Sequence, residues 1–110
     1  MTNGTQVSLA DLRKALTQLL DAVERQHGPT VDLKADYYWT IGPADAFRFD
    51  ITGCPEPTVG TLTDDVQSMR DILKTTHDEP IAVWHDLAHV IGILNRLAAL
   101  DLPGTVNGRL

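Results

Sequence analysis

The chain has 110 residues, of which 43% are hydrophobic and 22% are charged, both near the averages for globular proteins. This composition excludes a long disordered chain, and the single cysteine, Cys54, excludes an internal disulfide and a multi-cysteine zinc site. Nine basic against fifteen acidic residues give a net charge of −6, with no basic cluster that would neutralise nucleic-acid phosphates, so we expect no nucleic-acid partner.

The chain reads as one domain with short polar ends. We expect a flexible leader over 1–7, a single α+β domain over 8–102 and a flexible tail over 103–110. No basic region followed by an apolar run opens the sequence, and no stretch approaches the length of apolar chain that spans a bilayer. The expected location is therefore the cytoplasm, with no membrane partner.

The first predicted element is a helix that starts after Ser8. Ser8 and Asp11 form a capping box, and Gly28 followed by Pro29 ends the helix. Apolar side chains recur at helical spacing on one face, which predicts a single buried stripe. They are Leu9, Leu12, Leu16, Leu19, Leu20 and Val23.

A half-buried strand is predicted next. Odd positions from Val31 to Ile41 are apolar or aromatic and even positions are mostly polar, so Tyr37 and Trp39 are expected on the buried face. Residues 42–45 form a turn or short helical connection, and residues 47–51 alternate as a second, antiparallel strand. Thr58 and Val59, between prolines and a glycine, could add a short edge strand.

Two further helices follow. The first begins near Thr61–Asp65, where a threonine can cap and aspartates suit the helix dipole. The second, from about Ala82 to Leu100, is apolar around most of its circumference, which is typical of a helix packed on two sides or partly buried in a partner. Its narrow polar stripe is expected to face solvent. This stripe consists of His85, His89, Gly92 and Arg96.

These elements predict an α+β fold in the order α-β-β-α-α. A small antiparallel sheet, a hairpin with or without a third short strand, would pack against three helices. Because a two-stranded sheet is marginal alone, the helices or a partner must cover it.

The predicted hairpin is also the candidate partner-binding surface, because five of the six aromatic residues lie between Tyr37 and Phe49. Tyr38 would be an aromatic anchor among charged neighbours, as in many interface hot spots. The same charges would equally serve as ordinary cross-strand pairs. The candidate partner-binding residues are Tyr38, Trp39, Asp36, Asp50 and Arg48.

A second candidate site is the pair His85 and His89. Two histidines four residues apart project from one helical face, and their spacing matches that of the zinc-protease motif. Asp86 stands where that motif has its glutamate base, and a third ligand would have to come from residues such as those at 77–79. The alternative is that both histidines simply line a solvent-facing stripe.

Acidity, an aromatic-rich segment and an apolar last helix together favour a small cytoplasmic interaction module without catalytic activity or cofactor. Its partner would be a basic protein or a second copy of the chain, as in a homodimer. Antitoxin or immunity-type neutralisers share this size and charge. The alternatives are a metal-dependent hydrolase that uses His85 and His89, and an apolar-ligand pocket lined by Trp39, Phe47 and Trp84.

Overall fold

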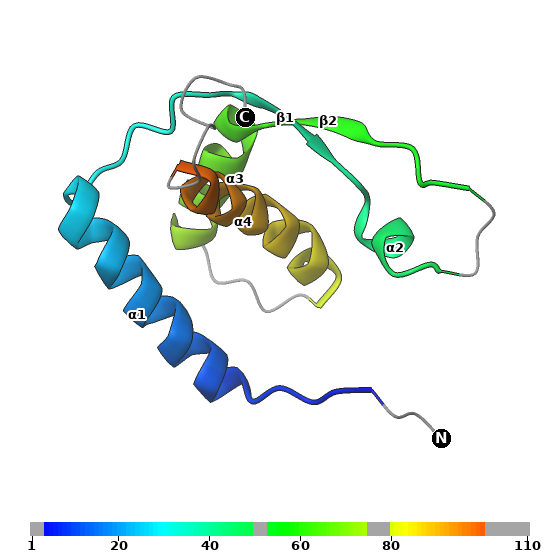
Figure 1. The fold of residues 1–110 in the computed structure, drawn as a ribbon, viewed down its shortest axis with the longest axis horizontal. Helices are drawn as coiled ribbons and strands as arrows, with labels where there is room; N and C mark the ends of the chain where they lie inside the picture. The colour runs from blue at the N-terminus through cyan, green and yellow to red at the C-terminus, as the bar shows by residue number, and fades with distance from the viewer. Residues whose placement is uncertain (1–3, 50–52, 75–79, 101–110) are drawn as a thin grey trace. The chain divides into compact units, whose positions relative to one another are not determined.

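The computed structural model describes residues 4–49, 53–74 and 80–100 (Figure 1). The chain divides into two compact units, Met1–Asp32 and Leu33–Leu110, which are described separately below. A single domain over 8–102 stays a prediction.

The first unit contains helix α1, Leu9–His27, with the predicted signals at both ends. The Ser8 hydroxyl oxygen accepts a hydrogen bond from the Asp11 N–H at 3.2 Å. Gly28 has a φ of 88°, which favours glycine, and its N–H donates to the Glu24 carbonyl at 2.8 Å. No residue of α1 is buried, and Leu19 of the apolar stripe is 63% exposed. The helix is therefore amphipathic, and most of its apolar stripe is exposed, while Leu16 and Val23 are half-buried.

The second unit contains an antiparallel two-stranded sheet of β1, Tyr37–Thr40, and β2, Thr58–Thr61. Trp39 is opposite Val59 in the register. The predicted pairing of the first strand with residues 47–51 is wrong for the described part of that segment.

The chain after β1 instead forms the one-turn helix α2, Pro43–Ala46. Pro43 stands in the first turn of α2, where its fixed φ is already helical and its missing N–H costs nothing. Phe47 and Phe49 follow outside any strand and are 85% and 92% exposed. Ile51 lies outside the described residues. The short edge strand expected at residues 58–59 is thus the actual partner of β1.

The two faces of β1 are also the reverse of the prediction. Tyr37 and Trp39 are 74% and 75% exposed, whereas Tyr38 and Thr40 are half-buried. Strict alternation shows only that two faces differ, and here both faces carry aromatic rings. The inward face of β1 is the one that carries Tyr38, whose hydroxyl donates a hydrogen bond to another element, as described below.

Helices α3, Leu62–Lys74, and α4, Pro80–Leu100, lie against each other (Figure 1). The first turn of α3 is capped from two places in the sequence. The Asp36 carboxylate accepts from the Thr63 N–H at 2.9 Å, and the Thr61 hydroxyl oxygen accepts from the Asp64 N–H at 3.4 Å. The Asp36 bond joins the segment before β1 to the start of α3, whereas the Thr61 cap is local to the end of β2.

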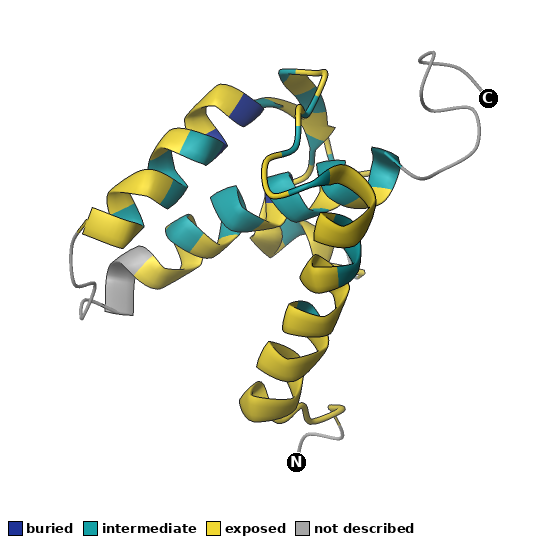
Figure 2. Ribbon diagram, turned by 90° about the vertical axis from the view of Figure 1, so that its left-hand side faces the viewer, coloured by how far each residue is buried: buried dark blue, intermediate teal, exposed yellow. Residues whose placement is uncertain are grey.

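The architecture is a small α+β fold with the predicted antiparallel sheet and long helices, in the order α1-β1-α2-β2-α3-α4. Little of the described chain is buried, as the few dark-blue stretches of the ribbon in Figure 2 show. Among the described residues only one large hydrophobic side chain is buried, that of Leu62 at 3% exposure. The described helices include none with the length and apolar character needed to cross a membrane.

Candidate functional site

The best-defined site is a buried carboxylate that joins three elements. Asp65, in the first turn of α3, is 2% exposed. The Tyr38 hydroxyl on β1 donates to Asp65 Oδ2 at 2.6 Å, and Asp65 Oδ1 lies 2.6 Å from Nδ1 of His89 on α4. With Asp65 ionised, its carboxylate only accepts hydrogen bonds, and this contact then requires a proton on His89 Nδ1. We call Tyr38, Asp65 and His89 the carboxylate network.

Two glycines make room for the Tyr38 side chain. Gly60 is opposite Tyr38 in the strand register, and a Cβ built on Gly60 would overlap the tyrosine ring. A Cβ built on Gly92 of α4 would overlap the Tyr38 hydroxyl and the Asp65 carboxylate. Gly92 is buried for this reason, although the sequence placed it on a solvent-facing stripe.

The network alters the acidity of the tyrosine. Partial burial, together with the hydrogen bond to Asp65 and the negative charge of its carboxylate, raises the pKa of Tyr38 to about 12 from the ordinary value of 10.0. All three effects disfavour a phenolate. Tyr38 therefore acts as a hydrogen-bond donor at neutral pH, which does not suit it to the role of a general base.

His85 lies beside the network on the same side of α4. The rings of His85 and His89 are 4.6 Å apart between centroids and meet edge to face, with His85 the more exposed. The carboxylate of Asp86 lies 3.7 Å from His85 Nδ1. The structure thus brings the two predicted metal ligands together.

The described residues do not supply a third metal ligand for His85 and His89. Across residues 4–49, 53–74 and 80–100, no group of three or more His, Cys, Asp or Glu side chains is placed to hold a metal ion. His77, Asp78 and Glu79, the expected sources of a third ligand, lie outside the described residues. Metal binding by His85 and His89 stays a prediction.

The residues predicted to bind a partner are used in different ways. Tyr38 belongs to the carboxylate network, and Asp36 caps α3. Arg48 pairs with Asp45 at 3.3 Å, within the exposed segment after β1, and does not lie across a sheet from Asp36. Trp39 alone of the described members is an exposed aromatic side chain. Asp50 lies outside the described residues.

Most of the polar stripe of α4 faces inward, and part of its apolar surface is left open. His89 and Arg96 are half-buried and Gly92 is buried, which corrects the expectation of solvent exposure for these three residues, whereas His85 is exposed as expected. By contrast, Trp84, Leu87 and Ile91, at helical spacing on the other side, are 62%, 53% and 50% exposed. We call these three residues the α4 stripe. Other large apolar side chains of the described residues are exposed as well, among them Leu73 and Phe47, but the α4 stripe gathers three on one helix face.

The sequence analysis explained Asp65 only by its favourable position at the start of a helix, and did not predict that it is a buried hydrogen-bond acceptor. The sequence does contain a signal for this role. Asp65 falls on the same face of α3 as Leu62 and Met69, at spacings of three and four residues, so a carboxylate interrupts the side of α3 that packs inward. A carboxylate at such a position must find donors, which predicts partners on neighbouring elements.

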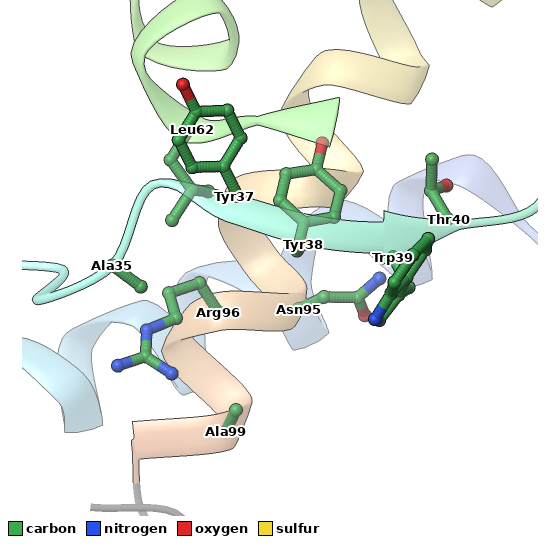
Figure 3. Close-up of a pocket in the computed structure, with 9 residues that line it drawn as sticks. All are labelled: Ala35, Tyr37, Tyr38, Trp39, Thr40, Leu62, Asn95, Arg96 and Ala99. Carbon is green, nitrogen blue, oxygen red and sulfur yellow. The ribbon is translucent and has the colours of Figure 1, made fainter. Parts of the chain in front are cut away.

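A small pocket opens between β1 and α4 (Figure 3). Its volume is about 210 Å³, and its walls come from residues 37–40 of the strand and from Asn95, Arg96 and Ala99 of the helix. It includes Trp39 but neither Phe47 nor Trp84, so it is not the pocket that the sequence suggested.

Comparison with known proteins adds no assignment. No protein-family model matches the chain, and no curated protein or solved structure matches it either. The functional argument therefore depends on the residues and their geometry.

We expect Tyr38→Phe to lower the free energy of unfolding by about 1–3 kcal/mol, because it leaves a buried carboxylate oxygen without its donor. Tyr37→Phe is the matched control. Tyr37 is 74% exposed on the same strand, and its loss of a hydroxyl should change stability by less than about 0.5 kcal/mol. Urea unfolding of both variants measures the difference. Equal effects would contradict the network.

The raised pKa of Tyr38 predicts a loss of stability in strong alkali. Folding favours the protonated phenol, so this contribution is complete below the unfolded pKa of 10.0 and disappears as pH rises toward about 12. An NMR titration of the Tyr38 ring carbons should show its midpoint near 12, with the signal identified by its absence in Tyr38→Phe. A midpoint at the ordinary value would show that the hydroxyl is not held by Asp65.

Proposed function

We propose that this protein is a small cytoplasmic protein-interaction module without catalytic activity, and that the α4 stripe is its contact surface. The observation that carries the proposal is the exposure of Trp84, Leu87 and Ile91 together on one helix face. Contiguous apolar surface of this kind marks protein contacts on soluble proteins. The exposed thiol of Cys54 is compatible with a reducing compartment.

The composition of the α4 stripe supports this role over a simple surface face. A tryptophan, a leucine and an isoleucine at i, i+3 and i+7 form the type of ridge with which one helix packs against another. Tryptophan is also among the residues most enriched at binding hot spots. Burial of the stripe would remove from water the three most exposed large apolar side chains among the described residues of α4, and so offset the weak hydrophobic core of the second unit.

We propose a second copy of the chain as the occupant. The stripe carries no charge, so nothing in it selects a charged partner, and an apolar ridge is complementary to a copy of itself around a two-fold axis. The net charge of −6 favours a basic partner only through long-range steering, which is weaker than direct contact. A basic protein, as for an antitoxin or immunity-type binder, is the alternative occupant.

Ile91→Lys should convert a dimer into a monomer, because it would place a charge in the centre of the apolar contact. Native mass spectrometry and light scattering of the full chain measure the change. Leu73→Lys is the matched control, since Leu73 is 78% exposed on α3 and outside the stripe. Circular dichroism checks that each variant is folded.

The expected result is a wild-type dimer, a monomeric Ile91→Lys and a dimeric Leu73→Lys. A wild-type monomer at micromolar concentration would overturn the second copy as the occupant, and would turn attention to a basic partner. A dimer that survives Ile91→Lys would overturn the α4 stripe as the contact surface.

A metal-dependent hydrolase that uses His85 and His89 is the second candidate, and one contact favours it. Asp65 Oδ1, at 2.6 Å from His89 Nδ1, fixes the ring with Nε2 left to bind an ion. Metal-ligating histidines commonly have such a carboxylate partner.

This candidate predicts about one zinc ion per chain after dialysis against zinc, since one pair of histidines supplies a single site. His85→Ala should abolish the uptake while leaving the carboxylate network in place, because His85 does not contact Asp65 through any hydrogen bond of the described structure. Elemental analysis is the measurement. Wild-type protein that remains free of zinc would exclude the hydrolase.

A further inference from the structure

The apolar side chains of α1 follow a spacing that is typical of paired helices. Leu9, Leu12, Leu16, Leu19 and Val23 are separated in turn by three, four, three and four residues. This alternation is the a and d spacing of a coiled coil, in which each apolar side chain packs between side chains of a facing helix. We call these five residues the α1 seam. Its spacing indicates that the element which covers it is a second helix, nearly aligned with α1.

The α1 seam is open along most of its length. Leu9, Leu12 and Leu19 are 61%, 44% and 63% exposed, and Leu16 and Val23 are half-buried. No residue of the helix is buried, and the helix belongs to the smaller of the two compact units. An apolar face of this length on a helix is normally covered by protein.

The charges of α1 favour an antiparallel helix of the same sequence as the partner. Residues 9–18 carry one acidic and two basic side chains, and residues 19–27 carry two acidic and one basic, with histidine counted as neutral. An antiparallel copy therefore places each positive half beside a negative half. It also brings the positive end of one helix dipole beside the negative end of the other. Because the helix as a whole has no net charge, it does not favour a strongly basic or acidic partner.

The proposed dimer needs more contact than the α4 stripe provides. A stable interface has about 20–30 residues on each side, whereas the α4 stripe has three. The α1 seam supplies five further apolar positions. It spans only about two heptads, fewer than the three or four that indicate an independent coiled coil. Each surface is thus too small alone, and the two together give the dimer a larger contact.

We propose that α1 pairs with α1 of a second copy as a short antiparallel helix pair. When the two seams are matched end to end, Leu16 faces Leu19 of the second copy, and Leu12 faces Val23 of the second copy. This inference rests on the proposed self-association and adds to it a second contact surface with a defined orientation.

Disulfide cross-linking of the full chain tests the pairing. Cys54→Ser removes the single cysteine, and Leu12→Cys and Val23→Cys are then introduced in separate chains. The two chains are mixed in equal amounts and oxidised in a glutathione buffer. Mass spectrometry separates the mixed disulfide from the two symmetric ones, because the two chains differ in mass.

We expect the mixed disulfide to be the main product, well above the statistical share, because a disulfide forms readily only between positions that face each other closely. Lys14→Cys with Asp21→Cys is the matched control. These two exposed residues are as far from the middle of α1 as residues on the seam, but they lie on the opposite face of the helix. Their mixed disulfide should not exceed the statistical share.

Leu19→Lys should weaken the dimer about tenfold or more, because it replaces a leucine in the middle of the buried contact. Thr17→Lys, which is exposed on α1 outside the seam, should leave the dimer unchanged. Native mass spectrometry at several protein concentrations measures the dissociation constant. Circular dichroism checks that both variants keep the helix content of the wild type.

The outcomes separate this inference from the proposed α4 contact. A wild-type dimer without an excess of the mixed disulfide would overturn the α1 pair and leave the α4 stripe in place. An excess of the two symmetric disulfides would overturn the antiparallel orientation. A dimer that survives Ile91→Lys but dissociates in Leu19→Lys would support the α1 pair and contradict the α4 stripe. A wild-type monomer would overturn both.

Discussion

The carboxylate of Asp65 sets the arrangement of the second unit. A carboxylate at 2% exposure is stable only if its oxygens accept hydrogen bonds, and Tyr38 and His89 supply them from β1 and α4. Both donors must therefore point toward α3. This requirement fixes which face of β1 turns inward and which face of α4 packs against α3, and it demands the two glycines, Gly60 and Gly92, beside the tyrosine.

Because polar groups of α4 face inward, apolar side chains are exposed on the opposite face of this helix. A helix that turns His89 and Gly92 toward its neighbours must turn another face away, and that face carries Trp84, Leu87 and Ile91. The described part of the chain buries a single large hydrophobic side chain, so hydrophobic burial within one chain is modest. The exposed α4 stripe and the polar centre are thus two consequences of the same packing, and this link supports the proposed interaction role.

Local signals in the sequence predicted local structure well. The capping box at Ser8 and the stop at Gly28 set the ends of α1, and the fold class and helix order follow from periodicity. The contacts between elements that are far apart in the sequence could not be predicted from such local signals. Pairing of β1 with β2 depends on a helical turn at Pro43, and the inward face of α4 depends on Asp65, a residue on another element. Hydrophobic periodicity identifies the most apolar face of an element as its buried face, so it predicts the wrong face where the interior of a fold is built around a polar network.

The most direct test of this account is a nuclear Overhauser spectrum of the full chain that reports which face of α4 points inward. We expect contacts between the Tyr38 ring protons and the α protons of Gly92, because Gly92 lies against the Tyr38 hydroxyl. Absence of these contacts, with contacts that instead join the indole of Trp84 to side chains of α3, would show that α4 packs by its apolar face and would contradict the account.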